Sequence, residues 1–376
     1  MYLHLKTFFK VSWFMLFYKK FSFRRFFFFL GFLFFFWLIW LSLVFFRFLD
    51  NLFYRKYKKQ EIKQPIFIIG NPRSGTTFLY DLIAQDKKRF AQPFLYQSLF
   101  CSITLYKMIK FFSSKSKKIK KFLGNRISFA NRFFSKFKSI HEIKLDKSEE
   151  DEAIFFLNFL SPSVYFICPF VEKIPELTII DNLNSKTRKK LMNHYKSCIK
   201  RFLYEFGNNR TYLCKNVMST GKIKTLIEAF PDAKIIYPLR HPYKTIPSMV
   251  KFYHSAWKLH SPEILKNSKS KETKDLAKSM MEFYKHVLKN KESLNKNLFI
   301  VKFEDLISNP EKTIKEVYKK LGIKMTSEYL NLIRNFIKKQ KRYQSKNNYN
   351  FEELGISEEF IYENLKDVFK EYNFKK

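Results

Sequence analysis

The chain has 376 residues, of which 46% are hydrophobic and 19% aromatic, and its formal net charge is +38. Such a chain can bury a full core in one large or two ordinary domains. Its charge indicates polyanionic partners, namely an anionic membrane surface, a phosphorylated cofactor or nucleic acid. Because Lys, Phe, Ile, Asn and Tyr are all abundant, the lysine excess alone does not favour nucleic acid. The four cysteines are scattered and never form C-x-x-C, so they suggest neither a disulfide framework nor a zinc site.

The N-terminal region is rich in phenylalanine. Residues 26–46 form a run of 21 without a charge, interrupted by Gly31 and Ser42, and a helix of this length crosses about 30 Å of hydrocarbon. A cleavable signal peptide is not favoured, because the run is too long and lacks a small-residue cleavage site. We predict an interfacial basic and aromatic segment, a transmembrane helix and a basic linker over residues 1–25, 26–46 and 47–64. A buried or interfacial helix is the alternative for 26–46.

A strand, a glycine-bounded loop and a helix are predicted after this linker. Residues 66–69 are apolar and mostly β-branched, Gly70 ends them, and residues 76–83 have the apolar spacing of a helix. Loop N–H groups at the positive end of a helix bind anions. The loop fits the nucleotide-triphosphatase pattern except that Thr76 stands in the lysine position, so Arg73 is the candidate to supply the charge. The predicted phosphate contacts are Arg73, Ser74, Gly75, Thr76 and Thr77.

A second anion site is predicted where a later strand ends. Residues 233–239 have the pattern of a strand, and Arg240 follows at its carboxyl end, where open α/β sheets bind ligands. A turn then leads into a helix that carries Ser248. Arginine can hold a phosphate with two parallel hydrogen bonds, and a serine hydroxyl adds another donor. The two motifs together predict a ligand with two separate phosphate groups.

Both motifs resemble those of a known family. The loop GNPRSGTT is similar to the 5′-phosphosulfate loop of sulfotransferases that use 3′-phosphoadenylyl sulfate (PAPS). The segment FPDAKIIYPLRHPYKTIPS resembles the 3′-phosphate site of that family, although Lys244 stands where an aspartate is common. The similarity covers about residues 66–372 and includes a weaker C-terminal match, in which Lys341, Arg342 or Tyr343 would contact the 3′-phosphate.

The resemblance implies an α/β, three-layer P-loop-like fold, with a central parallel sheet flanked by helices, over residues 65–376. A basic helical insertion at about 94–145 would lie on lipid headgroups or cover the acceptor site. The resemblance further implies that PAPS is the sulfuryl donor, that PAP is its product and that no metal is required. Arg73 would stabilise the charge on the leaving phosphate.

Four consecutive acids, residues 149–152, precede the apolar run 154–160. Ser148 and Asp151 form a possible N-cap pair, and acids in a first helical turn are favoured by the helix dipole. In many bacterial sulfotransferase-like sequences a similar Glu-Asp-Glu begins a helix that lines the acceptor pocket. By that resemblance Glu150 and Glu152 are candidates for the catalytic base, with Glu150 ahead, and His141 is a weaker alternative.

The sequence therefore predicts a membrane-anchored, single-pass sulfotransferase that modifies a hydroxyl or amine on a lipid, glycolipid or glycan. The catalytic domain would be cytoplasmic in a bacterium and luminal in a Golgi enzyme of a eukaryote. Two other functions stay open, a P-loop kinase or NTPase and a non-enzymatic protein that binds membranes or nucleic acid through its basic surface. The seven histidines show no metal-ligand spacing, so the sequence predicts no metal site.

Overall fold

The computed structural model describes residues 1–19, 21–115, 150–207, 209–266, 270–340 and 350–376. Its centre is a five-stranded sheet in the order β2-β3-β1-β4-β5. Each neighbouring pair of strands is parallel. In chain order the strands are Ile66–Ile68, Phe90–Ala91, Thr211–Lys215, Lys234–Leu239 and Leu298–Lys302.

The central strand β1 is apolar because both faces of the sheet are covered. Its three residues are all buried, as expected for a short strand inside a parallel sheet. Ile66 lies opposite Leu213 of β3 and Lys234 of β4, so the carboxyl ends of these three strands meet at one edge of the sheet. The predicted parallel sheet is therefore confirmed, while the short strand β2 has no counterpart in the prediction.

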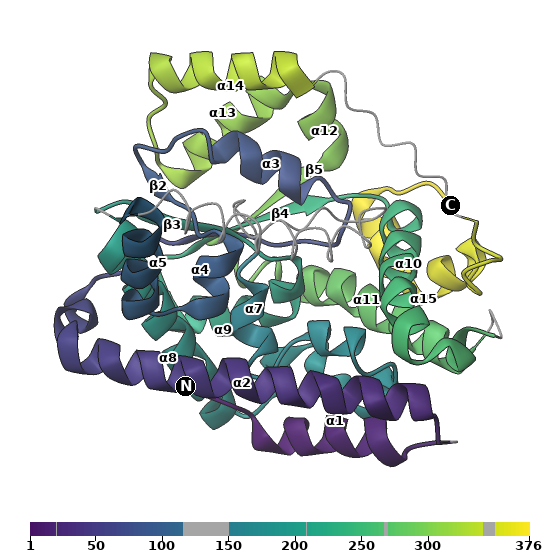
Figure 1. Cartoon of the computed structure of the whole chain (residues 1–376). Helices are drawn as coiled ribbons and strands as arrows, with labels where there is room; N and C mark the ends of the chain where they lie inside the picture. The colour runs from purple at the N-terminus through teal and green to yellow at the C-terminus, as the bar shows by residue number, and fades with distance from the viewer. Residues whose placement is uncertain (20, 116–149, 208, 267–269, 341–349) are drawn as a thin grey trace.

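Helices cover both faces of the sheet (Figure 1). On the upper face in that view lie α3, α12, α13 and α14, at Thr76–Ile83, Phe303–Ser308, Pro310–Leu321 and Ser327–Gln340. The other helices of the domain are α4 at Leu95–Phe100, α5 at Ile103–Lys115, α7 at Glu152–Phe156, α8 at Ser185–Phe202, α9 at Ile223–Ala229, α10 at Pro242–His260, α11 at Lys271–Asn290 and α15 at Glu358–Tyr372. The three-layer arrangement predicted from the sequence is confirmed.

Short 3₁₀ turns connect many of these helices. They lie at Arg55–Lys59, Pro162–Phe166, Val171–Lys173, Pro175–Leu177, Ile180–Asn182, Val217–Lys222 and Pro262–Leu265, and one π turn covers Leu203–Gly207. Of the insertion predicted at about 94–145, α4 and α5 belong to the described residues, and the rest lies outside them.

Two N-terminal helices form a further layer on the domain. Helix α1, Leu5–Phe17, and helix α2, Phe23–Phe53, lie side by side along one side of the molecule (Figure 1). We call this pair the N-terminal hairpin. Its inner side chains, among them Phe8, Phe29 and Phe36, belong to the same buried apolar core as α8, α10 and α11. Helix α2 extends beyond the predicted 26–46 at both ends and is long and apolar enough to cross a membrane.

Candidate functional site

The loop between β1 and α3 is a tight turn built on two glycines. Gly75 caps α3 with φ 87° and Gly70 has φ 152°, both in the region that favours glycine. A Cβ atom on Gly75 would come within 2.9 Å of the Phe303 ring, and one on Gly70 within 3.1 Å of Ser74 Oγ. Arg73 adopts φ 65° although it is not glycine. Such backbone conformations concentrate at ligand-binding loops.

Hydrogen bonds from the surrounding core fix the shape of this loop. The Ser74 hydroxyl donates to the Asn71 carbonyl at 2.5 Å, and the Tyr237 hydroxyl donates to Asn71 Oδ1 at 2.7 Å. The Gly70 N–H donates to Thr220 Oγ1 at 3.1 Å. The side chain of Ser74 is therefore used within the loop, whereas Thr77 is exposed at the start of α3. The first N–H groups of a helix have no partner within the helix and are available to an anion.

The second predicted motif meets the first in space. Arg240 follows β4, and its Nη1 donates to the carbonyl oxygen of Arg73 at 2.5 Å across 167 residues of sequence. Its guanidinium lies 3.9 Å from the centre of the Phe303 ring. The Tyr284 hydroxyl donates to the Arg240 carbonyl at 2.6 Å. These contacts hold the Arg240 guanidinium against the loop between β1 and α3. Ser248, the other residue of the second motif, is buried within α10.

Lys215 is a site residue that the sequence reasoning did not assign. It ends β3, is 2% exposed, and its Nζ donates to Thr77 Oγ1 at 3.1 Å. The same Nζ lies 3.7 Å from Glu150 Oε1. Lys215 therefore connects Thr77, at the start of α3, to Glu150. The sequence feature that could have identified Lys215 is its position at the carboxyl end of a predicted strand, where open sheets bind ligands.

The acids of residues 150–152 have different environments. Asp151 is fully buried and accepts hydrogen bonds from Asn216 Nδ2 at 2.8 Å, from the Tyr212 hydroxyl at 3.0 Å and from the Tyr195 hydroxyl. Although Asp151 occupies the N-cap position of α7, its side chain makes no capping hydrogen bond. Its carboxylate ties three core elements together instead. Ser148, its predicted capping partner, lies outside the described residues.

Glu152 keeps one oxygen without a partner. It begins α7 and accepts a hydrogen bond from the Ser161 hydroxyl, while its Oε2 is inaccessible to solvent and has no hydrogen-bond partner among the described residues. Burial raises the pKa of Glu152, and the positive charge of Lys222 opposes this shift. Burial likewise lowers the pKa of Lys222, whose Nζ lies 4.1 Å from the centre of the Phe155 ring. A buried carboxyl with a raised pKa is typical of catalytic acids and bases.

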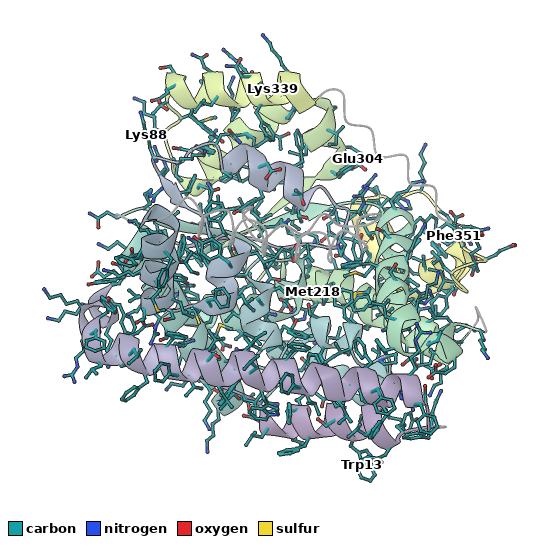
Figure 2. The ribbon with its side chains drawn as sticks, viewed as in Figure 1. Trp13, Lys88, Met218, Glu304, Lys339 and Phe351 are labelled. Carbon is teal, nitrogen blue, oxygen red and sulfur yellow. The ribbon has the colours of Figure 1, made fainter. Side chains whose placement is uncertain are left out.

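The C-terminal residues pack on the Arg240 side of the site. Phe351 lies 6.4 Å from Tyr243, ring centre to ring centre, so the chain returns to the start of α10 after residue 349 (Figures 1 and 2). Lys341, Arg342 and Tyr343 themselves lie outside the described residues, as does His141.

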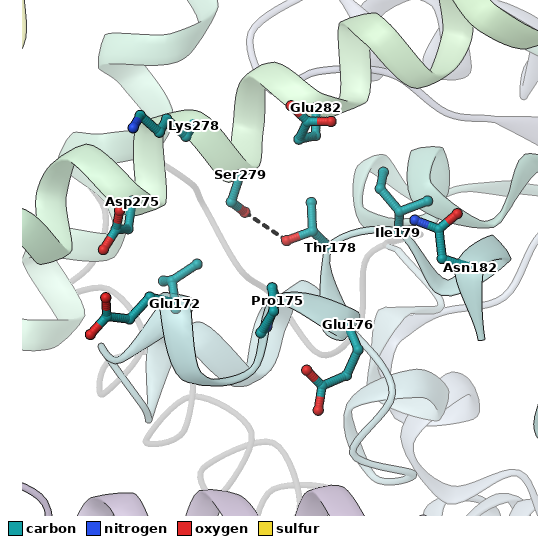
Figure 3. Close-up of a pocket in the computed structure, with 11 residues that line it drawn as sticks. Glu172, Pro175, Glu176, Thr178, Ile179, Asn182, Asp275, Lys278, Ser279 and Glu282 are labelled. Atoms are coloured by element: carbon teal, nitrogen blue, oxygen red, sulfur yellow. Dashed lines mark hydrogen bonds between the residues drawn. The ribbon is translucent and has the colours of Figure 1, made fainter.

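A cavity of about 490 Å³ lies elsewhere, between α11 and the turns over residues 171–182. Figure 3 shows its acidic side chains, Glu172, Glu176, Asp275 and Glu282, around the hydrogen bond between Ser279 and Thr178. None of the predicted phosphate contacts lines it. An acidic lining does not suit a phosphorylated ligand. In the described part of the chain, no group of three or more His, Cys, Asp or Glu side chains is arranged to hold a metal ion.

The chain is similar to known proteins in sequence and in fold. The chain is 25% identical over 287 residues to omega-hydroxy-beta-dihydromenaquinone-9 sulfotransferase Stf3 of Mycobacterium bovis, which covers 75% of this chain and 68% of the relative. The same figures apply to the Stf3 protein of Mycobacterium tuberculosis. The crystal structure of sulfotransferase STF9 from Mycobacterium avium has a TM-score of 0.70 and 17% identity, covering 88% of this chain and 82% of that one.

Sulfotransferase STF1 from Mycobacterium tuberculosis has a TM-score of 0.62 and 16% identity, covering 84% of this chain and 79% of that one. These structural likenesses show the shared fold. Residues 65–327, which include the phosphate loop, Lys215, Glu152 and Arg240, match the Sulfotransferase family. The protein is therefore a member of the sulfotransferase family.

Proposed function

We propose that the protein transfers a sulfuryl group from PAPS to a hydroxyl group on a membrane-associated lipid. The observation that carries this proposal is the hydrogen bond of 2.5 Å between Arg240 and the Arg73 carbonyl. It joins two anion-binding motifs at the carboxyl ends of β1 and β4. Family membership favours this activity over the kinase and the non-enzymatic binding protein that the sequence left open.

The residues of the loop fit a phosphosulfate group. Glycine at positions 70 and 75 keeps the loop tight, and the start of α3 offers its N–H groups and the exposed Thr77. PAPS, when bound, supplies the sulfuryl group and carries a phosphate on each side of its ribose. Gly75, Thr76 and Thr77 would hold the 5′ side, and Arg240 and Ser248 the 3′ side. Arg73 and Lys215 would stabilise negative charge that develops near the loop.

Glu152 is our choice for the general base. Its Oε2 has no hydrogen-bond partner among the described residues, and burial raises its pKa, which makes the carboxylate a better proton acceptor. Glu150, by contrast, lies 3.7 Å from the Lys215 ammonium group. We assign Glu150 the role of positioning Lys215 beside Thr77, although the sequence had placed Glu150 first. Asp151 is occupied by Asn216 and two tyrosines.

Two observations support a lipid acceptor. The Stf3 relatives are named for a hydroxylated menaquinone derivative. In addition, the segment that begins with Glu152 runs directly to the N-terminal hairpin, where Phe156 lies 6.1 Å from Phe32 and Phe159 lies 5.1 Å from Phe8, ring centre to ring centre. A lipid that enters beside the apolar hairpin would have its hydroxyl close to the start of α7.

Binding of PAP provides the direct test. PAP should raise the melting temperature of the purified protein. Arg240→Ala should abolish this shift, because the variant lacks the guanidinium that would contact a phosphate of PAP, while the fold remains. Arg334→Ala is the matched control, since Arg334 is an exposed arginine of α14 that pairs with Glu311. An unaltered PAP shift in Arg240→Ala would contradict the proposed site.

Product analysis then tests the reaction. Membranes that contain the protein should incorporate label from sulfur-labelled PAPS into a lipid whose mass increases by one sulfuryl group. Arg73→Ala should eliminate this product. Incorporation only into water-soluble material would contradict the lipid acceptor, and magnesium-dependent ATP hydrolysis without sulfuryl transfer would favour the NTPase alternative.

A further inference from the structure

We propose that the N-terminal hairpin lies flat in one leaflet of an anionic membrane and does not cross it. In this arrangement the headgroup and acyl-chain boundary covers the outer face of α1 and α2, and both chain termini stay on the side of the catalytic domain. The inference rests on the membrane association proposed above, but not on sulfuryl transfer. It replaces the single-pass topology expected from the sequence.

Helix α2 has two opposite faces along its whole length. Phe27, Phe34, Leu41 and Phe48 recur every seven residues, and each is between 57% and 66% exposed. Phe29, Phe36, Leu43 and Asp50 recur with the same period two positions later, and all four are buried. Residues two positions apart on a helix point in nearly opposite directions. One face of α2 therefore packs on the protein while a phenylalanine-rich stripe faces outward.

Helix α1 repeats this division. Leu5, Phe9, Trp13 and Phe17 recur every four residues and are between 55% and 64% exposed, whereas Thr7, Phe8, Val11 and Met15 are buried. Figure 2 shows Trp13 pointing away from the rest of the molecule. Tryptophan and phenylalanine on the apolar face of a helix are typical of segments that lie in a membrane interface.

The catalytic domain holds α2 at both ends. Near the first end, Arg25 Nη1 lies 3.3 Å from Glu263 Oε1 of the domain. Near the other end, Asp50 accepts from Arg201 Nε at 2.8 Å. Arg25 and Asp50 are 25 positions apart in α2, which corresponds to about 38 Å of helix and exceeds the ~30 Å of bilayer hydrocarbon. A spanning α2 would have to break one of these contacts and leave its charges unpaired.

Helix α1 is attached to the acidic rim of the cavity in Figure 3. Lys10 Nζ lies 2.8 Å from Glu176 Oε1, and the Tyr18 hydroxyl donates to Glu172 Oε1 at 3.4 Å. At the start of the chain, Arg47 Nη1 donates to Met1 Sδ at 3.4 Å. The chain thus begins beside the domain-bound end of α2. This arrangement leaves the N-terminus on the same side of a membrane as the domain.

Charge complementarity identifies the partner as an anionic bilayer. Exposed basic residues lie at the ends of both helices, namely Lys6, Arg24, Arg55, Lys56 and Lys59. Each basic residue close to an anionic surface adds to membrane attraction. A soluble protein surface rarely exposes so large an apolar patch without a partner. An interfacial helix pair with basic ends satisfies both features.

The topology can be tested in sealed vesicles with full-length protein that carries a different epitope tag at each terminus. The vesicles contain phosphatidylcholine with or without phosphatidylglycerol, and protease is added outside. We expect both tags to be cleaved on the same molecules, and stronger binding when phosphatidylglycerol is present. If one tag is always protected until the vesicles are opened, α2 spans the bilayer and the proposal is wrong.

A pair of matched variants tests the surface. Phe34→Glu should lower vesicle binding by about tenfold or more, because burial of a phenylalanine side chain is lost and a like charge is added. Leu332→Glu introduces the same charge at an exposed apolar position of α14 and should leave binding unchanged. The PAP-induced shift in melting temperature should be the same in both variants.

Other outcomes would overturn the proposal. A protein that ignores vesicles and forms a dimer that Phe34→Glu dissociates would use this surface for a second copy of the chain. Equal vesicle binding by wild type and Phe34→Glu would place the membrane contact elsewhere. Loss of PAP binding in a protein that still binds vesicles in the expected topology would contradict the proposed function alone.

Discussion

Two buried charged clusters in this protein are satisfied to different degrees. At the contact of α2 with the domain, the Asp50 carboxylate accepts from Arg201, from the Ser102 hydroxyl, from the N–H groups of Ile103 and Thr104 and from the Thr104 hydroxyl, at 2.8–3.1 Å. We call this group the Asp50 cluster. At the candidate site, Glu152 uses one oxygen and leaves Oε2 without a partner among the described residues.

We interpret this difference as the contrast between a structural contact and the proposed reactive site. In the Asp50 cluster the carboxylate pairs with a buried guanidinium and also caps the first turn of α5, so every lone-pair direction has a use. A fully satisfied buried network is rigid and costly to disturb. Glu152 retains hydrogen-bonding capacity and a raised pKa, which a substrate hydroxyl can use. The predictions below test this contrast, beginning with the largest expected effect.

Asp50→Ala should destabilise the protein by about 3–5 kcal/mol, because it leaves the buried Arg201 charge without its partner. The midpoint of denaturant unfolding should decrease accordingly. Glu61→Ala is the control, since Glu61 pairs with Lys63 on the fully exposed surface and its removal should not alter the midpoint. Equal midpoints for wild type and Asp50→Ala would show that the hairpin is not fixed by this cluster.

Glu152→Gln should lower kcat by about a hundredfold, the usual contribution of a positioned general base, or ~2.7 kcal/mol. The affinity for PAP should be unchanged, because we place Glu152 on the acceptor side of the proposed site. The wild-type rate should rise with pH through an apparent pKa above the ordinary glutamate value, and the variant should lack this limb. If the rate of Glu152→Gln still rises with pH and that of Glu150→Gln does not, Glu150 is the general base.

Lys215→Met should reduce kcat/KM by about tenfold, or ~1.4 kcal/mol, through the loss of a cation next to Thr77. The weaker effect is expected because Arg73 would still stabilise the developing charge. Lys302→Met is the matched control, since Lys302 also ends a strand, but it is exposed at the sheet edge. Identical losses in the two lysine variants would indicate a general effect of charge on substrate attraction.

The local motifs could be read from the sequence because each depends on short-range chemistry. The loop over Gly70 to Thr77 needs glycine at two positions. Arg240 follows directly after the strand that ends at Leu239, so its place at the carboxyl end of that strand can be predicted locally. The resemblance of these motifs to a family supplied the rest of the fold. The role of Lys215 was missed, because it requires knowing that β3 lies directly beside β1.

The arrangement of the N-terminal hairpin could not be derived from hydropathy. Residues 26–46 satisfy a transmembrane pattern by length and composition. That pattern contains no information on which face of the helix packs against the rest of the protein. The residues that distinguish a helix packed on the domain from a spanning helix are Arg25, Arg47 and Asp50. In the sequence they resemble the charged residues that commonly flank a transmembrane helix. Their partners Glu263, His194 and Arg201 lie more than 140 residues away in the sequence, so only the folded chain pairs them.

The smallest expected effect concerns the pH dependence of stability. Because burial raises the pKa of Glu152 above its ordinary value of 4.5, the unfolded chain releases this proton at lower pH than the folded protein does. Below pH 4.5 the carboxyl is protonated in both states and costs nothing. As pH rises toward the folded pKa, the contribution of Glu152 to folding stability falls, and above that pKa it no longer changes.

Glu152→Gln should therefore gain stability relative to wild type as pH increases from 4 to 7, measured as the difference in free energy of unfolding. Asp50→Asn should instead be less stable than wild type, because the buried Arg201 guanidinium loses its charged partner. A difference between Glu152→Gln and wild type that is flat with pH would mean that Lys222 and the hydrogen bond from Ser161 together offset the effect of burial on Glu152 completely. The site would then resemble the Asp50 cluster, and its unpaired oxygen would no longer mark the base.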